Sequence, residues 1–247
     1  MSHRFFVSPE SISQNQVTFD AALSHQLCNV LRMRPGALVI VLDNSGQEYQ
    51  VELTKVQRDG VTGHVRAQRI AQTEPRLSIT LYQCMLKGEH FEWVLQKGTE
   101  LGVSAFVPVF SRRTIGRDVQ RIEKKRQRWE RIIREAAEQS HRGRLPTLNR
   151  PVPFAEACPQ SAQVHALSLI PWEETAENSL AHVMHALGSR PASMGLFIGP
   201  EGGFDPAEIA LAQRAGIQAV TLGPRILRAE TAALVATAII MSETGEM

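Results

Sequence analysis

The sequence predicts an α/β protein in which a small, strand-rich domain precedes a larger domain built on a parallel sheet. In residues 1–70, short apolar runs are bounded by turn residues, which is typical of a small antiparallel sheet or barrel. From residue 77 onward, short apolar strands alternate with helical stretches, which indicates a parallel sheet with helices on its faces. The 247 residues are 43% hydrophobic and 21% charged, a composition that excludes a disordered or fibrous chain.

The first domain is predicted to contain one short helix and three strands. The helix covers His25–Arg32 and ends at the turn residues 34–36. Strands are predicted at Ala37–Asp43, Glu48–Val56 and Val61–Ile70. The polar segment 71–76 is the candidate linker, so the predicted domains are 1–72 and 76–247.

The second domain is predicted to alternate strands with helices. Strands are predicted at Leu77–Cys84, Ala105–Phe110, Val164–Ile170, Met194–Ile198 and Ala219–Leu222. Helices are predicted over Glu89–Gly102, within Asp118–Arg144, between Asp205 and Gly216, and over Ala232–Ile240. Asp205, Pro206 and Glu208 have the spacing of an N-cap with a capping box. The last helix consists almost wholly of small and apolar residues, so we expect it to be buried on most sides.

Several classes of protein are excluded by what the sequence lacks. No apolar run approaches the roughly 20 residues of a membrane span, and the N-terminus has no signal-peptide pattern. The three cysteines, Cys28, Cys84 and Cys158, are far apart and have no metal-ligand spacing. We therefore expect a cytoplasmic protein with buried thiols, no metal and no membrane partner.

One segment carries the excess positive charge of a chain whose formal net charge is only +2. Residues 112–150 hold 13 basic and five acidic residues, and 11 of the 13 are arginine. Arginine pairs bidentately with phosphate and stacks on bases, so this segment favours binding of nucleic acid. The alternative is an ordinary solvated helix face that nearby glutamates partly neutralise.

This basic segment has helical periodicity. The residues of the expected packing stripe are Val119, Ile122, Trp129, Ile133 and Ala136. The residues of a second, basic face are Arg121, Lys124, Arg128 and Arg131. The sequence therefore predicts a helix that packs with one stripe and presents positive charge with another.

Two loops at the carboxyl ends of strands are the candidate functional site. Residues 197–204 (FIGPEGGF) contain three glycines and a proline, so the backbone can approach a ligand closely. Residues 222–232 (LGPRILRAETA) place Arg225, Arg228 and Glu230 where an apolar helix begins, and charges there need partners or a function. A plain strand-to-helix turn and a structural Arg228–Glu230 pair are the alternatives. Neither loop is a P-loop or a dinucleotide fingerprint.

The two loop sequences together resemble the signature of the SPOUT methyltransferases. Within that class the chain is similar to the bacterial 16S ribosomal RNA uridine-N3 methyltransferases. Three further matches support the narrower resemblance: HQLCNVLRMRPG (25–36), VLQKGTELGV (94–103) and EAAEQSHRGRLP (135–146). The chain departs from the family at Ala229, where threonine is common, and at His90 and Phe91, where the family is usually more basic.

The resemblance implies a PUA-like RNA-binding β-barrel domain followed by a domain with a deep trefoil knot, an arrangement that composition alone would not suggest. It also implies a homodimer and S-adenosyl-L-methionine as the cofactor. The cofactor-binding residues implied are Leu169, Phe197, Ile198, Gly199, Glu201, Gly202, Gly203, Leu222, Gly223, Ile226, Leu227, Arg228 and Thr231.

The implied reaction is methyl transfer to N3 of a uridine in 16S ribosomal RNA or in the small ribosomal subunit. Arg228 is the candidate for stabilising the uridine anion. Glu230 is expected to orient Arg228 rather than take the proton, because a carboxylate paired with arginine is a weak base. The candidate RNA-binding residues are Arg32, Arg34, Lys97, Arg121, Lys124, Arg128, Gln139 and Arg142.

Three other functions remain open at this point. The chain could methylate another RNA target or atom, or it could bind RNA without catalysis, which would explain the basic segment but not the two glycine-proline loops. A nucleotide-dependent dehydrogenase would need a dinucleotide fingerprint near residues 82–89, which have none.

Overall fold

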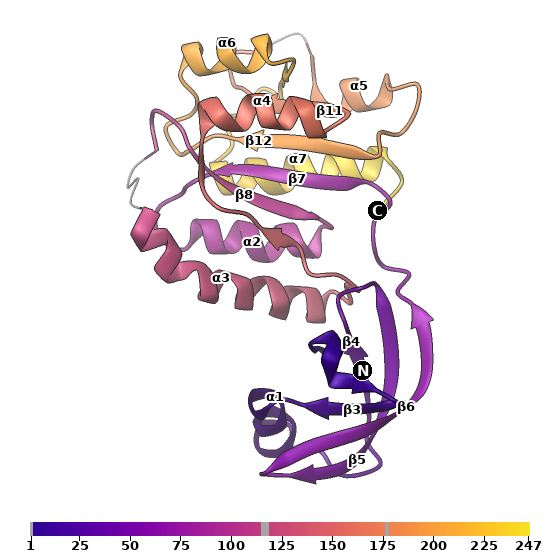
Figure 1. Ribbon diagram of the computed structural model, residues 1–247. Helices are drawn as coiled ribbons and strands as arrows, with labels where there is room; N and C mark the ends of the chain where they lie inside the picture. The colour runs from indigo at the N-terminus through magenta and orange to yellow at the C-terminus, as the bar shows by residue number, and fades with distance from the viewer. Residues whose placement is uncertain (1, 115–118, 176–177) are drawn as a thin grey trace. The chain divides into compact units, whose positions relative to one another are not determined.

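The computed structural model describes residues 2–114, 119–175 and 178–247, and the side chains of Val119 and Arg121 lie outside that description. The chain divides into two compact units (Figure 1). The first unit comprises Met1–Glu74 with Ala137–Leu145, and the second comprises Pro75–Ala136 with Pro146–Met247. Among the described residues, none of the helices has both the length and the apolar character needed to cross a membrane.

The first unit is built on a six-stranded sheet with the order β1-β4-β5-β6-β3-β2. Its strands are β1 (Arg4–Phe6), β2 (Ile12–Ser13), β3 (Gln16–Phe19), β4 (Leu38–Leu42), β5 (Gln47–Gln57) and β6 (Gly60–Ile70). The β1–β4 pair is parallel and the other pairs of this sheet are antiparallel. The three predicted strands correspond to β4, β5 and β6, whereas β1 to β3 and the 3₁₀ turn η1 (Pro9–Ser11) are too short for their patterns to be read from the sequence.

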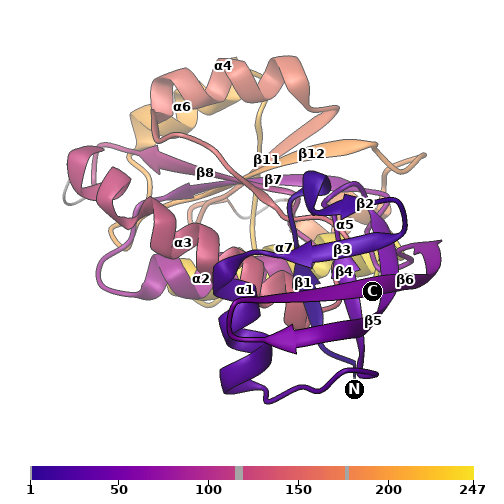
Figure 2. The same ribbon diagram turned by 60° about the horizontal axis from the view of Figure 1, so that its bottom comes forward.

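The helix of this unit begins earlier than predicted. Helix α1 covers Ala21–His25 and continues as the π-helical turn η2, Gln26–Val30 (Figure 2). The Asp20 side chain fixes the start, because it accepts a hydrogen bond of 2.8 Å from the Leu23 backbone N–H. Arg32 has φ +50°, which no α-helix allows, so the predicted end at Arg32 is wrong.

A buried ion pair holds the segment Ala137–Leu145 within the first unit. The Glu74 carboxylate accepts hydrogen bonds from Arg142 Nε at 3.0 Å and Arg142 Nη2 at 2.9 Å. The same carboxylate also accepts from the backbone N–H groups of Gly143 at 2.8 Å and Arg144 at 3.1 Å. Because Arg142 is only 4% exposed, its guanidinium is not offered to an RNA, and its assignment as an RNA contact is wrong.

We expect Arg142→Ala to lower the free energy of unfolding by about 3–5 kcal/mol, because it leaves the Glu74 carboxylate without its buried partner. Arg144→Ala is the control on the same segment: it removes one exposed hydrogen bond to the Ser45 carbonyl and costs about 1 kcal/mol. Urea unfolding of both variants measures the difference. Equal losses would contradict the structural role of Arg142.

The second unit is built on a wholly parallel sheet with the order β10-β8-β7-β12-β11-β13, and β9 pairs with β8. Its strands are β7 (Ser78–Cys84), β8 (Ala105–Phe110), β9 (Thr147–Leu148), β10 (Val152–Pro153), β11 (Leu167–Pro171), β12 (Ser193–Ile198) and β13 (Gln218–Val220). Strand β8 has the predicted bounds, and β7, β11, β12 and β13 lie within three residues of theirs. The prediction of an α/β fold with a parallel sheet is confirmed.

Helices cover both faces of this sheet (Figure 1). They are α2 (His90–Glu100), α3 (Val119–Gln139), α4 (Phe154–Val164), α5 (Leu180–His185), α6 (Pro206–Arg214) and α7 (Ala229–Glu243). One core cluster joins the sheet to α2, α3, α5 and α7, and a second joins it to α4 and α6. Strand β7 supplies both, since Ile79 and Leu81 face the first cluster and Tyr82 and Cys84 the second.

Two predictions about the long helices have different outcomes. On α3 the packing stripe is confirmed for Ile122, Trp129, Ile133 and Ala136, each at most 6% exposed. On α7 one face is buried, but Leu234, Val235, Ala238 and Ile239 are only half-buried, so burial on most sides is wrong for this chain. Helix α7 is therefore apolar on two faces, of which one is buried and the other is partly exposed to solvent.

Candidate active site

The loop that follows β12 is a tight turn of glycines and a proline. The Gly203 backbone N–H donates to the Pro200 carbonyl at 2.9 Å, and Gly203 has φ +69°, a conformation that favours glycine. A Cβ on Gly203 would lie 2.8 Å from Glu173 Oε1. Beyond the loop, Asp205 and Glu208 form the predicted capping box of α6, which is confirmed. The loop is therefore held at both ends and exposes backbone.

The loop that follows β13 leads into α7. Thr221 Oγ1 accepts a hydrogen bond of 3.1 Å from the Gly223 N–H, and Gly223 has φ +110°. After this turn, Ile226 is 88% exposed, an unusual position for a large apolar side chain. Arg228 is the N-cap residue of α7, and Glu230 lies in the first turn of the helix. The loop thus presents both apolar and charged side chains.

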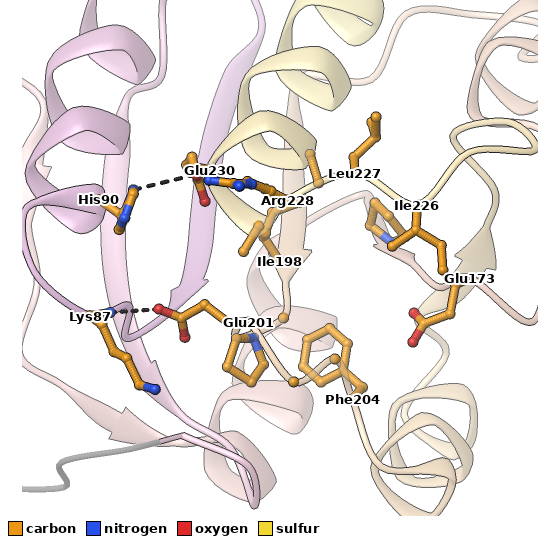
Figure 3. A pocket seen from close by; sticks show the side chains of 17 residues that line it. Lys87, His90, Glu173, Ile198, Glu201, Phe204, Ile226, Leu227, Arg228 and Glu230 are labelled. Atoms are coloured by element: carbon orange, nitrogen blue, oxygen red, sulfur yellow. Dashed lines mark hydrogen bonds and ion pairs between the residues drawn. The ribbon is translucent and has the colours of Figure 1, made fainter.

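These two loops enclose a cavity of about 530 Å³, called the main pocket below (Figure 3). Its lining comprises Lys87, His90, Pro171, Glu173, Ile198, Gly199, Pro200, Glu201, Gly202, Gly203, Phe204, Ile226, Leu227, Arg228, Ala229, Glu230 and Ala232. A second cavity of about 480 Å³, the adjoining pocket, is lined by the β13 loop and the end of β11. The residues shared by the two cavities are Pro171, Glu173, Ile226, Leu227 and Ala232. Both cavities lie at the carboxyl ends of parallel strands, where ligands bind in α/β sheets.

The main pocket combines charges of both signs. His90 Nδ1 lies 3.3 Å from Glu230 Oε1, and the two side chains point toward one another in Figure 3. Glu201 Oε1 accepts a hydrogen bond of 2.7 Å from the Lys87 backbone N–H, which ties the β12 loop to the segment after β7. Within the described residues, the Arg228 guanidinium has neither an ion-pair nor a hydrogen-bond partner, so it is available to a ligand.

Most of the cofactor-binding residues named from the sequence lie around the two pockets. Ile198, Gly199, Glu201, Gly202, Gly203 and Arg228 line the main pocket, Leu222 and Gly223 line the adjoining pocket, and Ile226 and Leu227 line both. Leu169 and Phe197 do not reach a cavity, because both side chains are fully buried in the core. Thr231 is exposed and lines neither pocket.

The two candidate catalytic residues both line the main pocket, but they do not form the expected pair. Glu230 contacts His90, and within the described residues no ion pair joins Glu230 to Arg228. The expectation that Glu230 orients Arg228 is therefore wrong. Residues close together at the start of a helix point in different directions, and the partner of Glu230 comes instead from α2.

The candidate RNA-binding residues fall into four groups. Arg32, Arg34, Lys124 and Gln139 are not buried. Lys97 and Arg128 are engaged locally: Lys97 Nζ lies 2.7 Å from Glu100 and over the Trp93 ring, and Arg128 Nη2 lies 2.7 Å from Glu92 Oε2. The Arg121 side chain lies outside the described residues, and Arg142 is buried against Glu74.

Sequence reasoning missed three polar residues of the main pocket, namely Lys87, His90 and Glu173. Lys87 and His90 follow β7, and Glu173 follows β11; both strands pair with β12 in the parallel sheet. Because neighbouring parallel strands end at the same edge of the sheet, the pairing of β7 with β12 places the residues after β7 beside the β12 loop. The order of the strands would have indicated these residues, but hydrophobic periodicity does not reveal that order.

The thiols take no part in this site. Cys84 and Cys158 are fully buried in the core cluster that joins the sheet to α4 and α6, as predicted, whereas Cys28 is only half-buried, so the prediction is wrong for that residue. Burial raises the pKa of the Cys158 thiol to about 12 and also raises the pKa of Cys84, so neither is a thiolate at neutral pH. No group of three or more potential metal ligands occurs among the described residues.

The pocket residues suit a nucleoside that carries a cationic amino-acid tail. Exposed Ile226 and half-buried Leu227 offer apolar surface to a ring, and the glycine loop leaves space that a Cβ would fill. Glu173, Glu201 and Glu230 can face positive charge, and Lys87 and Arg228 can face a carboxylate. S-adenosylmethionine has all of these features.

Comparison with known proteins agrees with this chemistry. Residues 73–241 match the model of an RNA methyltransferase domain, and residues 20–65 match that of an RNA methyltransferase PUA domain. The chain is 37% identical to the ribosomal RNA small subunit methyltransferase E of Synechocystis, over 97% of this chain and 77% of that protein.

Two solved structures are also similar. The ribosomal RNA small subunit methyltransferase E from Neisseria gonorrhoeae bound to S-adenosyl methionine superimposes with a TM-score of 0.86 at 33% identity, covering 98% of both chains. A methyltransferase from Legionella pneumophila in complex with the cofactor SAM superimposes with a TM-score of 0.87 at 28% identity, again over 98% of both chains.

Proposed function

The chain belongs to the family of ribosomal RNA small subunit methyltransferase E, and from this premise we propose that it transfers a methyl group from S-adenosylmethionine to N3 of a uridine in 16S ribosomal RNA. The observation that carries the proposal is the main pocket, where two glycine-containing loops meet beside Arg228. The similar structure from Neisseria gonorrhoeae is bound to S-adenosyl methionine.

The residues that would hold the cofactor come from three strand ends. Gly199, Gly202 and Gly203 offer backbone, Leu222, Ile226 and Leu227 offer apolar contact, and Pro171 closes the side toward β11. When bound, S-adenosylmethionine supplies an electrophilic methyl group on a positively charged sulfur. Leu169 and Phe197 contribute by packing beneath these loops rather than by side-chain contact.

Arg228 has the position and the chemistry to stabilise a uridine anion. N3 of uridine carries a weakly acidic proton and becomes a good nucleophile only when that proton leaves, which places negative charge on O2 and O4. A guanidinium aimed at one of these oxygens is worth about 3 kcal/mol in the transition state. Because N3 is a base-pairing atom, the uridine must be unpaired or extruded to reach the pocket.

The basic helix α3 is proposed to contact RNA phosphates. Lys124 and Arg131 are exposed, and Arg131 has a distant partner, Glu135 at 3.9 Å. Arg32 and Arg34 of the first unit are accessible as well, and that unit contains the match to the PUA domain. We include Lys97, Arg121, Arg128 and Gln139 as secondary contacts.

We expect the double variant Lys124→Glu/Arg131→Glu to bind RNA more weakly and with a flatter salt dependence. Each phosphate that is no longer neutralised reduces the slope of log K against log salt by about 0.7–0.9. Fluorescence anisotropy at several salt concentrations measures the slope. Lys124→Gln/Arg131→Gln is the control, because it removes the positive charges without adding repulsion. An unchanged slope in both variants would mean that this helix face is only solvated.

We further propose three features that the resemblance implies: the domains 1–72 and 76–247, a deep trefoil knot in the second domain, and a homodimer. The half-buried apolar residues of α7, together with Trp93 on α2, which is 49% exposed, support the dimer, because a second copy would cover them. Sedimentation of the protein gives its mass in solution and tests the dimer alone.

Incubation of the protein with small-subunit RNA and S-adenosylmethionine carrying a labelled methyl group tests the reaction. Digestion to nucleosides and mass spectrometry should show the label in 3-methyluridine. If the label were found at another atom or base, the protein would still be a methyltransferase, but its target would not be N3 of uridine. RNA binding without any transfer, on naked RNA and on assembled small subunits alike, would indicate a non-catalytic RNA-binding protein.

A further inference from the structure

We infer that His90, held by Glu230, is the general base that removes the N3 proton of the uridine. This inference rests on the proposed function, which requires that N3 lose its proton in the course of methyl transfer. The sequence motifs pointed to Glu230 as a partner of Arg228, and the structure pairs it with His90 instead.

The contact between His90 and Glu230 lies inside the main pocket. His90 Nδ1 is 3.3 Å from Glu230 Oε1, and both residues line the cavity together with Arg228 (Figure 3). The His90 side chain is 50% exposed, whereas that of Glu230 is only 14% exposed. The histidine is therefore accessible to a substrate, and the carboxylate behind it is largely shielded from water.

This arrangement leaves one imidazole nitrogen free for chemistry. In the tautomer that carries its proton on Nδ1, the nitrogen next to the Glu230 carboxylate, Nε2 has the lone pair that can accept a proton. The Glu230 carboxylate also stabilises the imidazolium that forms, as the aspartate of a Ser-His-Asp triad does for its histidine. The 3.3 Å contact is an ion-pair distance without the alignment of a hydrogen bond, and such contacts commonly tighten when the substrate binds.

The other charged side chains that line the main pocket are less suited by position or by chemistry. Arginine and lysine, the types of Arg228 and Lys87, are hydrogen-bond donors without an acceptor. Glu201 already accepts the Lys87 backbone N–H at 2.7 Å. Glu173 lies against Gly203, whose added Cβ would meet its carboxylate, so it belongs to the β12 loop side of the cavity.

His90 also borders an open groove outside the main pocket. The groove is lined by Glu89, His90, Glu92, Trp93, Gln96 and Ile132. Arg128 from α3 is paired with both carboxylates on this side, at 3.5 Å from Glu89 and 2.7 Å from Glu92. The charges around His90 come from Glu230 and Arg228 of α7, Lys87 after β7 and Glu201 of the β12 loop. On the groove side, Arg128 offsets one of the two negative charges of Glu89 and Glu92. A base at this border can meet a nucleotide that enters from outside.

The proton transfer and the methyl transfer balance in atoms and electrons. The N3–H proton moves to Nε2 of His90, and the electron pair left on N3 forms the new bond to the methyl carbon. The bond between that carbon and sulfur breaks, and its electron pair stays on sulfur as a neutral thioether. Arg228 faces the charge that builds on the uridine oxygens, and the imidazolium later releases its proton to water.

The test is a single-turnover rate measured against pH for the wild type, His90→Gln and Glu230→Gln. Glutamine keeps polarity and size but cannot accept a proton, so His90→Gln should slow transfer by roughly 10²-fold or more near neutral pH. The rate of this variant should recover at alkaline pH, where the uridine ionises without help. RNA containing 5-fluorouridine, whose N3 is more acidic, should rescue His90→Gln far more than the wild type.

The matched control is His185→Gln. His185 lies on α5 of the same unit, and its Nδ1 is 3.8 Å from Glu243 Oε2, so it forms a second histidine–glutamate contact away from the pocket. This variant should keep the wild-type profile. Calorimetry with S-adenosylmethionine should give the same affinity for the wild type, His90→Gln and His185→Gln. As a readout independent of turnover, nitrogen NMR of the free protein should show that Glu230→Gln changes the chemical shifts of the His90 ring nitrogens, because the carboxylate beside Nδ1 is lost.

The outcomes separate this inference from the proposed function. If His90→Gln keeps the wild-type rate and pH profile, His90 is not the base, although the enzyme still methylates uridine. If the wild type itself places no label on N3 of uridine, the proposed function fails and the inference fails with it. A slow His90→Gln that neither alkaline pH nor 5-fluorouridine rescues would also overturn the inference, because it would indicate a positioning role only.

Discussion

Arg228→Ala is expected to slow methyl transfer about 10²- to 10³-fold, the usual cost of removing one preorganised donor from a developing anion. The fold should survive, because within the described residues the guanidinium has no partner and the side chain does not cap α7. The transfer rate of Arg228→Lys should lie between those of the wild type and Arg228→Ala, since an ammonium keeps the positive charge but lacks the planar guanidinium. The measurement is the single-turnover rate at saturating S-adenosylmethionine.

The control for this prediction is Arg214→Ala, which removes an exposed arginine from the last turn of α6, away from both pockets. Thermal unfolding of all three variants checks that the fold is intact. If Arg228→Ala turns over at the wild-type rate, Arg228 has no part in the chemistry, and the anion must be stabilised by another cation such as Lys87.

Gly203→Val is expected to raise the Kd for S-adenosylmethionine roughly 10- to 100-fold. The loop conformation that binds the cofactor keeps φ +69° at this position, where a side chain adds backbone strain of about 1–3 kcal/mol. The new Cβ would also lie 2.8 Å from Glu173 Oε1, inside the lining of the main pocket. A shift of the loop would relieve both the backbone strain and the contact with Glu173. The same shift would move the backbone away from the position in which it contacts the cofactor. Titration calorimetry measures the affinity.

Gly216→Val is the matched control for backbone strain. Gly216 also has positive φ, +82°, but a Cβ there has no atom within 4 Å among the described residues, and the glycine lies at the end of α6 outside the main pocket. Both variants should lose a similar amount of stability, whereas only Gly203→Val should lose affinity. If the two bind S-adenosylmethionine equally well, the β12 loop is only a turn.

The sequence correctly predicted the elements that depend only on the pattern of neighbouring residues. Strand β8 and the capping box of α6 follow from a few consecutive residues, so both are correct in the structure. Helix α1 was misplaced because the pattern of apolar residues was read without the Asp20 cap. Strands of two or three residues, such as β2, contain too little sequence to show a period.

Long-range pairing limited what could be said about the site. The loops around Gly202 and Arg228 were recognisable because each is contiguous, but the partner of Glu230 lies far away in sequence, on α2. Arg142 shows the same limit: a basic residue in a basic segment suggests RNA, yet a distant carboxylate, Glu74, buries it. Charge counts alone cannot distinguish an exposed arginine from a paired one.

The most direct test of the proposed site is a crystal structure of the protein soaked with S-adenosylmethionine. We predict that the nucleoside lies between the loops 199–203 and 222–227, with the methyl group facing the space between Arg228 and His90. The prediction would be contradicted if the compound bound at any other place and left the main pocket empty.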